Sequence, residues 1–262
     1  MSVQVRYYTD PACPRSWGCE PELRRLMWEF GDGLSFTWVM GGLAREYGPE
    51  SPSQQIALWV EVAAESGMPI DPRLWLENPI SSTYPACQAV KAAAEQGPGA
   101  AYSYLRRLRE GLLAGRRKLD HAEALVAEAG PARLDVERFR IDLASNASVE
   151  AFAADLEEVR SNGFALPSAV FVGQDGSRQA VSGSNPYESY GDAARAAGAT
   201  EIAEHPGSAL EVVQRFGRAA TREVEVLTAK PRPVVEAELW TLAREWRLRP
   251  LPVLTGTLWE TA

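Results

Sequence analysis

The chain has 262 residues, of which 45% are hydrophobic and 24% are charged, so it can bury an apolar core and is not a disordered protein. Its formal net charge of −8 argues against nucleic acid as a partner. No apolar run approaches the roughly 20 residues that cross a bilayer. The chain also enters its first strand without a charged and then apolar leader, so we expect a cytoplasmic protein that does not associate with membranes.

The first predicted element is a strand over residues 3–8, and an amphipathic helix over residues 22–30 follows it. Between them lies Thr9-Asp10-Pro11-Ala12-Cys13-Pro14-Arg15-Ser16-Trp17. This order places Cys13 at or just before a helix N-terminus, where unpaired N–H groups and the helix dipole favour a thiolate. Pro14 suits the first helical position, and Arg15 adds positive charge. The alternative is a buried, inert cysteine.

Residues 34–40 alternate in polarity and predict a second strand, parallel to the first in a βαβ unit. The next hundred residues are alanine-rich and helical, with predicted helices over residues 53–66, 85–95, 100–114, 120–129, 135–144 and 149–160. The last of these is expected to bury its apolar side chains, which are Val149, Phe152, Ala153, Leu156 and Val159.

Leu166-Pro167 then opens a strand, a position where proline is tolerated because the first residue need not donate to the ladder. Asp175-Gly176 predicts a hairpin turn, and residues 178–181 form the returning strand. A helix is predicted from Asn185-Pro186 through residue 197.

The C-terminal segment, residues 205–262, holds 8 Lys/Arg and 7 Asp/Glu and is almost neutral. It contains predicted helices over residues 208–216 and 221–227, and an amphipathic helix whose apolar residues are Val235, Leu239, Leu242, Ala243 and Trp246. A hairpin over residues 248–259 gives a helix-turn-helix-like, winged arrangement. Because its charge is too balanced to follow phosphates, we favour a docked module over DNA binding.

The stretch from Asp10 to Trp17 resembles the Asp-Pro-x-Cys-Pro-x-(Cys/Ser)-Trp signature of the DsbA-like branch of the thioredoxin superfamily, in particular its cytoplasmic FrnE and YjbH types. The resemblance implies an α/β thioredoxin fold over residues 1–48 and 159–200, an all-helical insertion over residues 49–158, and a small C-terminal helical module of winged type over residues 205–262. It also implies a cis-proline at Pro167 that faces Cys13.

In this resemblance Cys13 is the catalytic nucleophile, and Ser16 replaces the second active-site cysteine. The expected site is Cys13, Pro14, Arg15 and Ser16 for catalysis, with Trp17, Leu166 and Pro167 for substrate binding. A disulfide exchange that begins at Cys13 then stops at a mixed disulfide. Cys19 lies roughly 9 Å further along a helix, which is too far for a disulfide.

Release would need an external low-molecular-weight thiol, and we expect no tightly bound cofactor and no metal site. Cys87, at a predicted helix start, is a candidate secondary thiol; the alternative is a small packed residue, as for Cys19. Neither His121 nor His205 has an evident cysteine or carboxylate partner in the sequence.

Two functional hypotheses follow, and the first of them has a variant. The first is a monothiol DsbA-family oxidoreductase, or a kappa-class glutathione transferase or isomerase relative that acts on a small molecule. The second is a non-catalytic adaptor of the Clp-protease type. Partners are therefore a thiol, disulfide or small-molecule substrate, or a protein, and a homodimer is left open. A Cys13 pKa well below about 8.5 and an open cleft favour the enzyme, whereas a covered Cys13 and an exposed apolar groove favour the adaptor.

Overall fold

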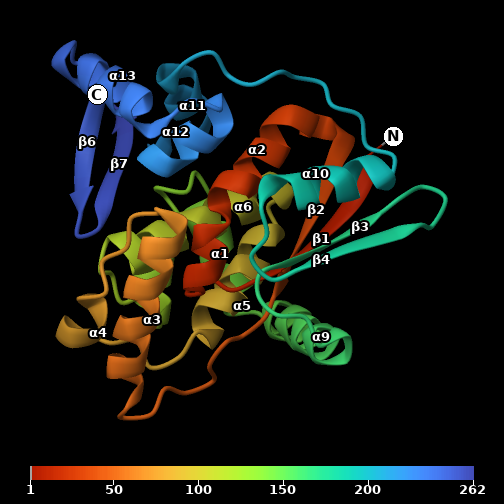
Figure 1. Ribbon diagram of the computed structural model, residues 1–262. Helices are drawn as coiled ribbons and strands as arrows, with labels where there is room; N and C mark the ends of the chain where they lie inside the picture. Colours follow the sequence, from red (N-terminus) through yellow and green to blue (C-terminus); the bar gives the residue numbers. More distant parts are fainter. Residues whose placement is uncertain (1) are drawn as a thin grey trace.

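The computed structural model describes residues 2–262 and contains a four-stranded sheet in the order β2-β1-β3-β4 (Figure 1). The strands are β1 (Val3–Thr9), β2 (Leu34–Met40), β3 (Ser168–Val172) and β4 (Arg178–Ser182). β1 and β2 are parallel, as the βαβ pattern predicts, and β3 and β4 are antiparallel to their neighbours. The mixed α/β thioredoxin-like fold expected from the resemblance is confirmed.

Helices cover both faces of this sheet. On one face, Val5 and Tyr7 pack with α2 (Glu20–Phe30) and α10 (Tyr187–Ala196) in the main core. Tyr8 points the other way, because successive strand residues alternate, and it packs with Val159 of α9 (Asn146–Asn162). A short helix, α1 (Pro14–Gly18), precedes α2, and a single 3₁₀ turn (Gly31–Gly33) leads from α2 into β2.

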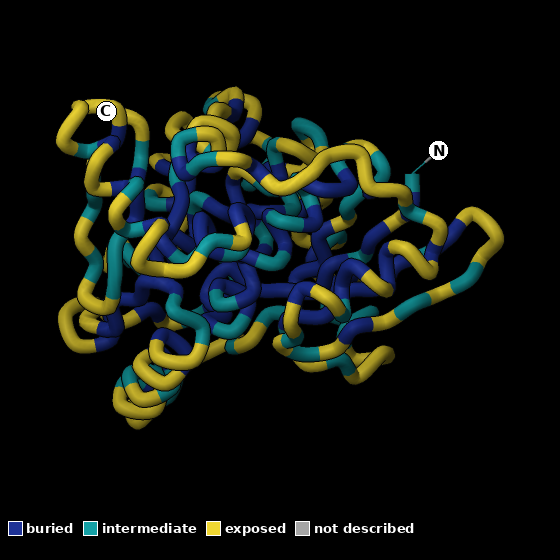
Figure 2. The backbone as a smooth tube through the Cα atoms, turned by 45° about the horizontal axis from the view of Figure 1, so that its top comes forward, coloured by how far each residue is buried: buried dark blue, intermediate teal, exposed yellow. Residues whose placement is uncertain are grey.

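The region between β2 and β3 is helical, as predicted. Its elements are α3 (Ser51–Ser66), α4 (Leu74–Glu77), α5 (Tyr84–Ala94), α6 (Pro98–Arg109), a π-helical turn (Glu110–Ala114), α7 (Ala122–Ala127), α8 (Val136–Leu143) and α9. Residues of these helices and of the sheet belong to one apolar cluster. Figure 2 shows that buried backbone gathers in the middle of the molecule, with exposed backbone at its periphery.

The predicted inward face of α9 is partly wrong. Phe152 is buried, but Val149 is 50% exposed and Ala153 is also exposed. The helix instead turns Asp155 inward, where its Oδ2 accepts from the Met40 backbone N–H at 2.8 Å and pairs with Lys91 Nζ at 2.8 Å. The inward face of the helix therefore includes a buried ion pair, and the predicted core residues Leu156 and Val159 are half-buried.

The C-terminal module, residues 205–262, has its own sheet and core. Its elements are α11 (Ala209–Phe216), β5 (Arg218–Ala220), α12 (Thr221–Thr228), α13 (Arg232–Arg244), β6 (Leu248–Val253) and β7 (Gly256–Thr261). The strand order is β5-β7-β6, and β6 and β7 form an antiparallel hairpin, which we call the wing (Figure 1). Trp246 lies beyond the end of α13 and is 86% exposed, so its predicted place on the apolar face of that helix is wrong.

Among residues 2–262, none of the helices combines the length and the apolar character needed to cross a membrane.

Candidate functional site

Cys13 caps the N-terminus of α1, as the turn sequence predicts. Its Sγ accepts a hydrogen bond from the Ser16 backbone N–H at 3.3 Å. It also lies 4.0 Å from the carbonyl oxygen of Leu166. The structure therefore brings Cys13 and Ser16 next to Leu166, as the resemblance implies, and the Leu166–Pro167 peptide bond is cis.

The surroundings of Cys13 differ from those that the helix start alone predicts, because the direction of the pKa shift is upward. The residue is 4% exposed, and burial raises its pKa. Hydrogen bonding from Ser16 lowers the pKa, the Asp10 carboxylate raises it, and Arg109 lowers it, but burial outweighs them.

Arg15 and Trp17 each contact other parts of the chain. The Arg15 guanidinium points to α3, where it lies 3.2 Å from Glu61 and 3.3 Å from Glu65 in exposed ion pairs. Trp17 is fully buried, and its Nε1 donates to the Pro69 carbonyl at 2.9 Å. Pro14 is buried at the first position of α1.

A hydrogen bond to Asp10 connects Cys87 to the Cys13 turn. The buried Asp10 carboxylate accepts from the backbone N–H groups of Ala12 at 2.8 Å and Leu43 at 2.9 Å, and from Cys87 Sγ at 3.2 Å. Burial raises the pKa of Asp10. Burial and then Asp10 raise the pKa of Cys87 well above its usual range, which makes it a poor attacking thiol.

Cys19 lies between α1 and α2, and burial raises its pKa to about 11. All three cysteines are free and buried. The expectation that the histidines lack carboxylate neighbours is wrong: His121 Nδ1 is 3.4 Å from Asp120, and His205 Nδ1 is 3.3 Å from Glu29. In the part of the chain that the structure describes, no group of three or more metal-ligating side chains could hold an ion.

Sequence reasoning missed a buried charged network where α2, α6 and α12 meet. We call it the charged network, and its members are Glu20, Arg24, Arg106, Arg109, Glu110 and Glu223, each at most 6% exposed. Glu223 lies 3.1 Å from Arg24 and 2.8 Å from Arg106. It also accepts from the Ala220 backbone N–H at 2.6 Å, which caps α12.

The other two carboxylates of the network also face arginines, and Arg106 is shared among all three. Glu20 lies 2.5 Å from Arg109, and Glu110 lies 2.8 Å from Arg106. Burial raises the pKa of Glu20 and of Glu110, but the facing arginines outweigh burial and hold both pKa values below the usual range. The guanidinium of Arg106 also lies 4.4 Å from the Trp17 ring, which connects the network to α1.

One sequence signal could have found this network. Arg106 and Arg109 alternate with buried leucines in α6, so at least one of them faces the core wherever that helix packs. An arginine in such a position is almost never buried without a partner.

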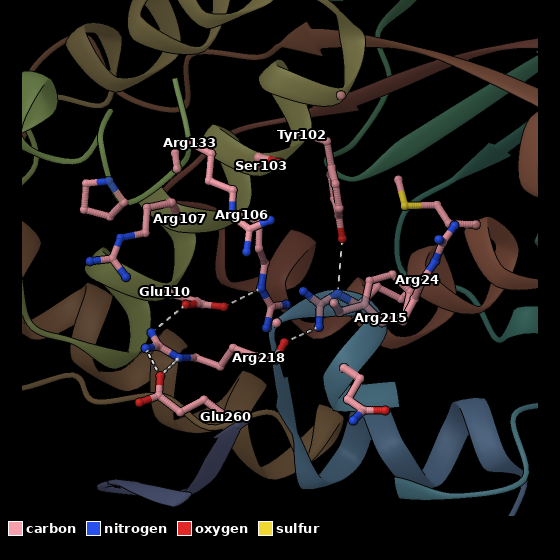
Figure 3. A pocket seen from close by; sticks show the side chains of 17 residues that line it. Arg24, Tyr102, Ser103, Arg106, Arg107, Glu110, Arg133, Arg215, Arg218 and Glu260 are labelled. Carbon is pink, nitrogen blue, oxygen red and sulfur yellow. Dashed lines mark hydrogen bonds and ion pairs between the residues drawn. The ribbon is translucent and has the colours of Figure 1, made fainter. Parts of the chain in front are cut away.

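A cavity of about 550 Å³ opens beside the charged network, and Cys13 is not among its lining residues (Figure 3). It lies between α2, α6 and the C-terminal module. The functional features of the molecule are therefore divided between two places, the covered Cys13 turn and this cavity.

Comparison with known proteins matches residues 7–192 to the family described as Thioredoxin. The chain is 28% identical to the ClpXP adapter protein SpxH of Halalkalibacterium halodurans, over 98% of this chain and 88% of the relative. It is 25% identical to the ClpXP adapter protein SpxH of Bacillus subtilis, over 99% and 89%.

Two solved structures share the fold. The cytosolic disulfide reductase DsbM of Pseudomonas aeruginosa aligns with a TM-score of 0.58 at 19% identity, over 68% of this chain and 88% of its own. A structure described as a probable DsbA oxidoreductase from Streptomyces coelicolor aligns with a TM-score of 0.60 at 22% identity, over 79% and 96%. The sheet order, the Cys13 turn and the family match agree, and the chain belongs to the thioredoxin family as a DsbA-like member of that superfamily.

Proposed function

We propose that this protein is an adaptor that binds a client polypeptide and presents it to the ClpXP protease. The observation that carries the proposal is the state of Cys13. Its thiol is 4% exposed, its pKa is raised by burial, and Ser16 stands where a resolving thiol would be needed. A site of this kind is suited to packing and recognition rather than to rapid turnover.

The extent of the similarity supports the same reading. The thioredoxin match ends at residue 192, before the C-terminal module begins. The relatives named as ClpXP adapters align over 98% and 99% of this chain, which leaves too few residues unmatched to omit the module. The module is therefore common to this chain and to relatives that carry the adapter name.

The proposal is tested with ClpX and ClpP of the source organism and a lysate of the same cells. We expect at least one protein to be degraded faster when the chain is added, as measured by quantitative mass spectrometry over time. Cys13→Ser should retain this stimulation, because the proposal does not use the thiol. If no substrate depends on the chain, or if Cys13→Ser abolishes the stimulation, the adaptor function as stated is wrong.

A second candidate is monothiol exchange, in which the Cys13 thiolate attacks a disulfide, forms a mixed disulfide and expels the other sulfur as a thiolate. An external low-molecular-weight thiol would then release Cys13 by a second exchange. The 4.0 Å approach of Cys13 Sγ to the Leu166 carbonyl, beside Pro167, favours this candidate. A transferase or isomerase activity of the kappa-class type stays a prediction that no contact at Cys13 favours.

Ser16→Cys separates turnover from binding, because it supplies the missing second thiol. If Cys13 can exchange, the variant should reduce insulin at least about tenfold faster than the unmodified chain, while Cys13→Ser/Ser16→Cys should not. Equal and negligible rates for all three proteins would exclude the oxidoreductase candidate and leave the adaptor untouched.

A further inference from the structure

The cavity beside the charged network is open to solvent and lined by four parts of the chain, one of which is the segment 131–133 between α7 and α8. α2 contributes Arg24 and Met27, and α6 contributes Arg106 and Arg107. The C-terminal module contributes the end of α11, together with Arg218 of β5. Its volume, about 550 Å³, lies within the range of roughly 300–1,000 Å³ usual for ligand sites. We call it the cationic cleft (Figure 3).

The floor of the cleft is electrically balanced. Arg218 lies 2.9 Å from Glu110 and also pairs with Glu260. Arg24 and Arg106 share Glu223, as described above. These arginines are held in place by carboxylates of the protein itself, so the floor is a rigid surface whose charges are already neutralised.

The rim of the cleft carries positive charge that the protein does not neutralise. Arg133 and Arg215 both line the cleft and are exposed, and within residues 2–262 no carboxylate lies within 4.0 Å of either guanidinium. Arg107 also lies on the rim, and it shares the single carboxylate of Glu128 with Arg117, at 2.6 and 2.8 Å. Such a surplus stands out in a chain whose net charge is −8.

Apolar atoms lie between these charges. Met27 and Phe216 are half-buried in the wall, and Pro131 and Ala132 border the rim beside Arg133. A ligand that fits must therefore combine negative charges with apolar groups. An acidic polypeptide segment has this composition, whereas a nucleic acid would bring a continuous row of phosphates towards a protein of the same overall sign.

We infer that the cationic cleft binds an acidic segment of a partner polypeptide, with Arg133 and Arg215 as the two residues that select its charge. The inference rests on the proposed function only in naming the client as the source of that segment. Carboxylates of the segment pair with the rim arginines, because guanidinium groups offer bidentate donors to carboxylates. Apolar side chains of the segment contact the wall.

The test uses fluorescence anisotropy with a fluorescein-labelled peptide, Glu-Leu-Glu-Glu-Phe-Glu, and its neutral counterpart, Gln-Leu-Gln-Gln-Phe-Gln. We expect the full chain to bind the acidic peptide and to bind the neutral one at least about tenfold more weakly, an affinity difference of about one logarithmic unit. Arg133→Glu/Arg215→Glu should weaken binding of the acidic peptide by at least the same factor. Added salt should weaken it as well, since the rim is exposed.

The matched control is Arg160→Glu/Arg178→Glu, which changes the net charge equally at two exposed arginines that do not line the cleft. It should bind the acidic peptide within about twofold of the unmodified chain, a change of less than one logarithmic unit in affinity. Equal losses in both double variants would mean that only overall charge matters, and the inference would be wrong. If the chain bound oligodeoxythymidine more tightly than the acidic peptide, and only the cleft variant lost that binding, the ligand of the cleft would be a nucleic acid instead of a polypeptide.

The ClpXP degradation measurement separates this inference from the proposed function. If the cleft variant loses the acidic peptide but still stimulates degradation fully, the cleft binds anions without serving the client, and the inference fails while the adaptor stands. If no client exists but the peptide contrast holds, the cleft stands as an acidic-peptide site and the adaptor fails.

Discussion

The helical insertion and the C-terminal module are joined to the sheet in different ways. Helices α3 to α8 share one continuous apolar cluster with the strands, in which Tyr7, Trp59 and Leu105 are all buried. The C-terminal module has a separate apolar cluster, which includes Leu239 and Trp259. Few apolar side chains cross that second junction, among them Trp28, Ala220 and Leu258. Glu223 of the module enters the charged network there and faces Arg24 and Arg106.

Polar contacts also attach the wing of the module. Thr255, in the turn between β6 and β7, donates to the Ile70 carbonyl at 3.0 Å and accepts from the Ile70 N–H at 2.7 Å. Apolar contacts are non-directional and tolerate small shifts, whereas buried ion pairs and hydrogen bonds depend on every partner being present. The first junction should therefore behave as part of one domain. The second should depend on each of its buried polar contacts.

One substitution removes the central ion pairs of the second junction. Glu223→Gln removes the carboxylate that both Arg24 and Arg106 face, and it leaves two buried positive charges under-compensated. We expect the free energy of unfolding to fall by roughly 3–5 kcal/mol, as measured by urea denaturation. Glu236→Gln, which removes an exposed ion pair with Arg232, should cost less than about 1 kcal/mol. Similar losses in the free energy of unfolding for the two variants would mean that the second junction does not depend on its buried ion pairs.

The two apolar clusters can be weakened separately. Leu105→Ala and Leu239→Ala each remove a fully buried side chain and should each cost roughly 2–5 kcal/mol. Hydrogen exchange should distinguish them. In Leu105→Ala the strands and the insertion should lose protection together, whereas in Leu239→Ala the loss should be confined to the module. Loss of protection throughout the chain in Leu239→Ala would mean that both clusters act as one core.

Acid should weaken the second junction before the first. Glu110 pairs with Arg218 of the module, and its pKa is lowered in the folded protein, so its contribution is complete above the unfolded value of about 4.3. This contribution is lost as the pH falls below that value and through the folded pKa, at about 1.4 kcal/mol for each unit of depression. Denaturation at successive pH values should show this decline, and Glu110→Gln should make it shallower. An unchanged slope in Glu110→Gln would assign the acid sensitivity to other groups.

The smallest effect concerns the Cys13 turn, which belongs to the first junction. Asp10→Asn removes a buried negative charge that raises the pKa of Cys13, so the thiol should react modestly faster with iodoacetamide at pH 8. Mass spectrometry identifies the labelled cysteine, and Cys87 should still react most slowly because it is fully buried. Asp175→Asn, in the exposed turn between β3 and β4, should leave the rate unchanged. A slower reaction in Asp10→Asn would reverse the assigned sign.

Much of the fold could be predicted from the sequence, because apolar periodicity decides whether a segment is a helix or a strand. The four strands of the main sheet and the wing hairpin lie within a few residues of their predicted positions. α4 was missed because it has only four residues and lies between Pro72 and Pro79, so it shows no periodicity. The face of α9 was misjudged because Lys91, the partner of Asp155, is distant in sequence.

The candidate site was predicted less completely, for a related reason. The position of Cys13 at a helix start follows from local sequence. Its approach to Leu166 was expected only from the family resemblance. Its pKa depends on burial by residues from several elements, which local sequence does not report. Arg106 and Glu223 are 117 positions apart, and nothing in either segment names the other as its partner.

The Glu223 carboxylate has a consequence for any shortened form of this protein. A chain that ended at Ala199 would keep all four strands of the main sheet and every helix of the insertion. It would nevertheless lose the acceptor that Arg24 and Arg106 share, and Ile70 would lose both of its hydrogen bonds to the wing. Such a fragment would carry a newly uncovered, positively charged surface. An exchange of modules between related proteins should therefore transfer α12 together with the arginines of α2 and α6 that it faces.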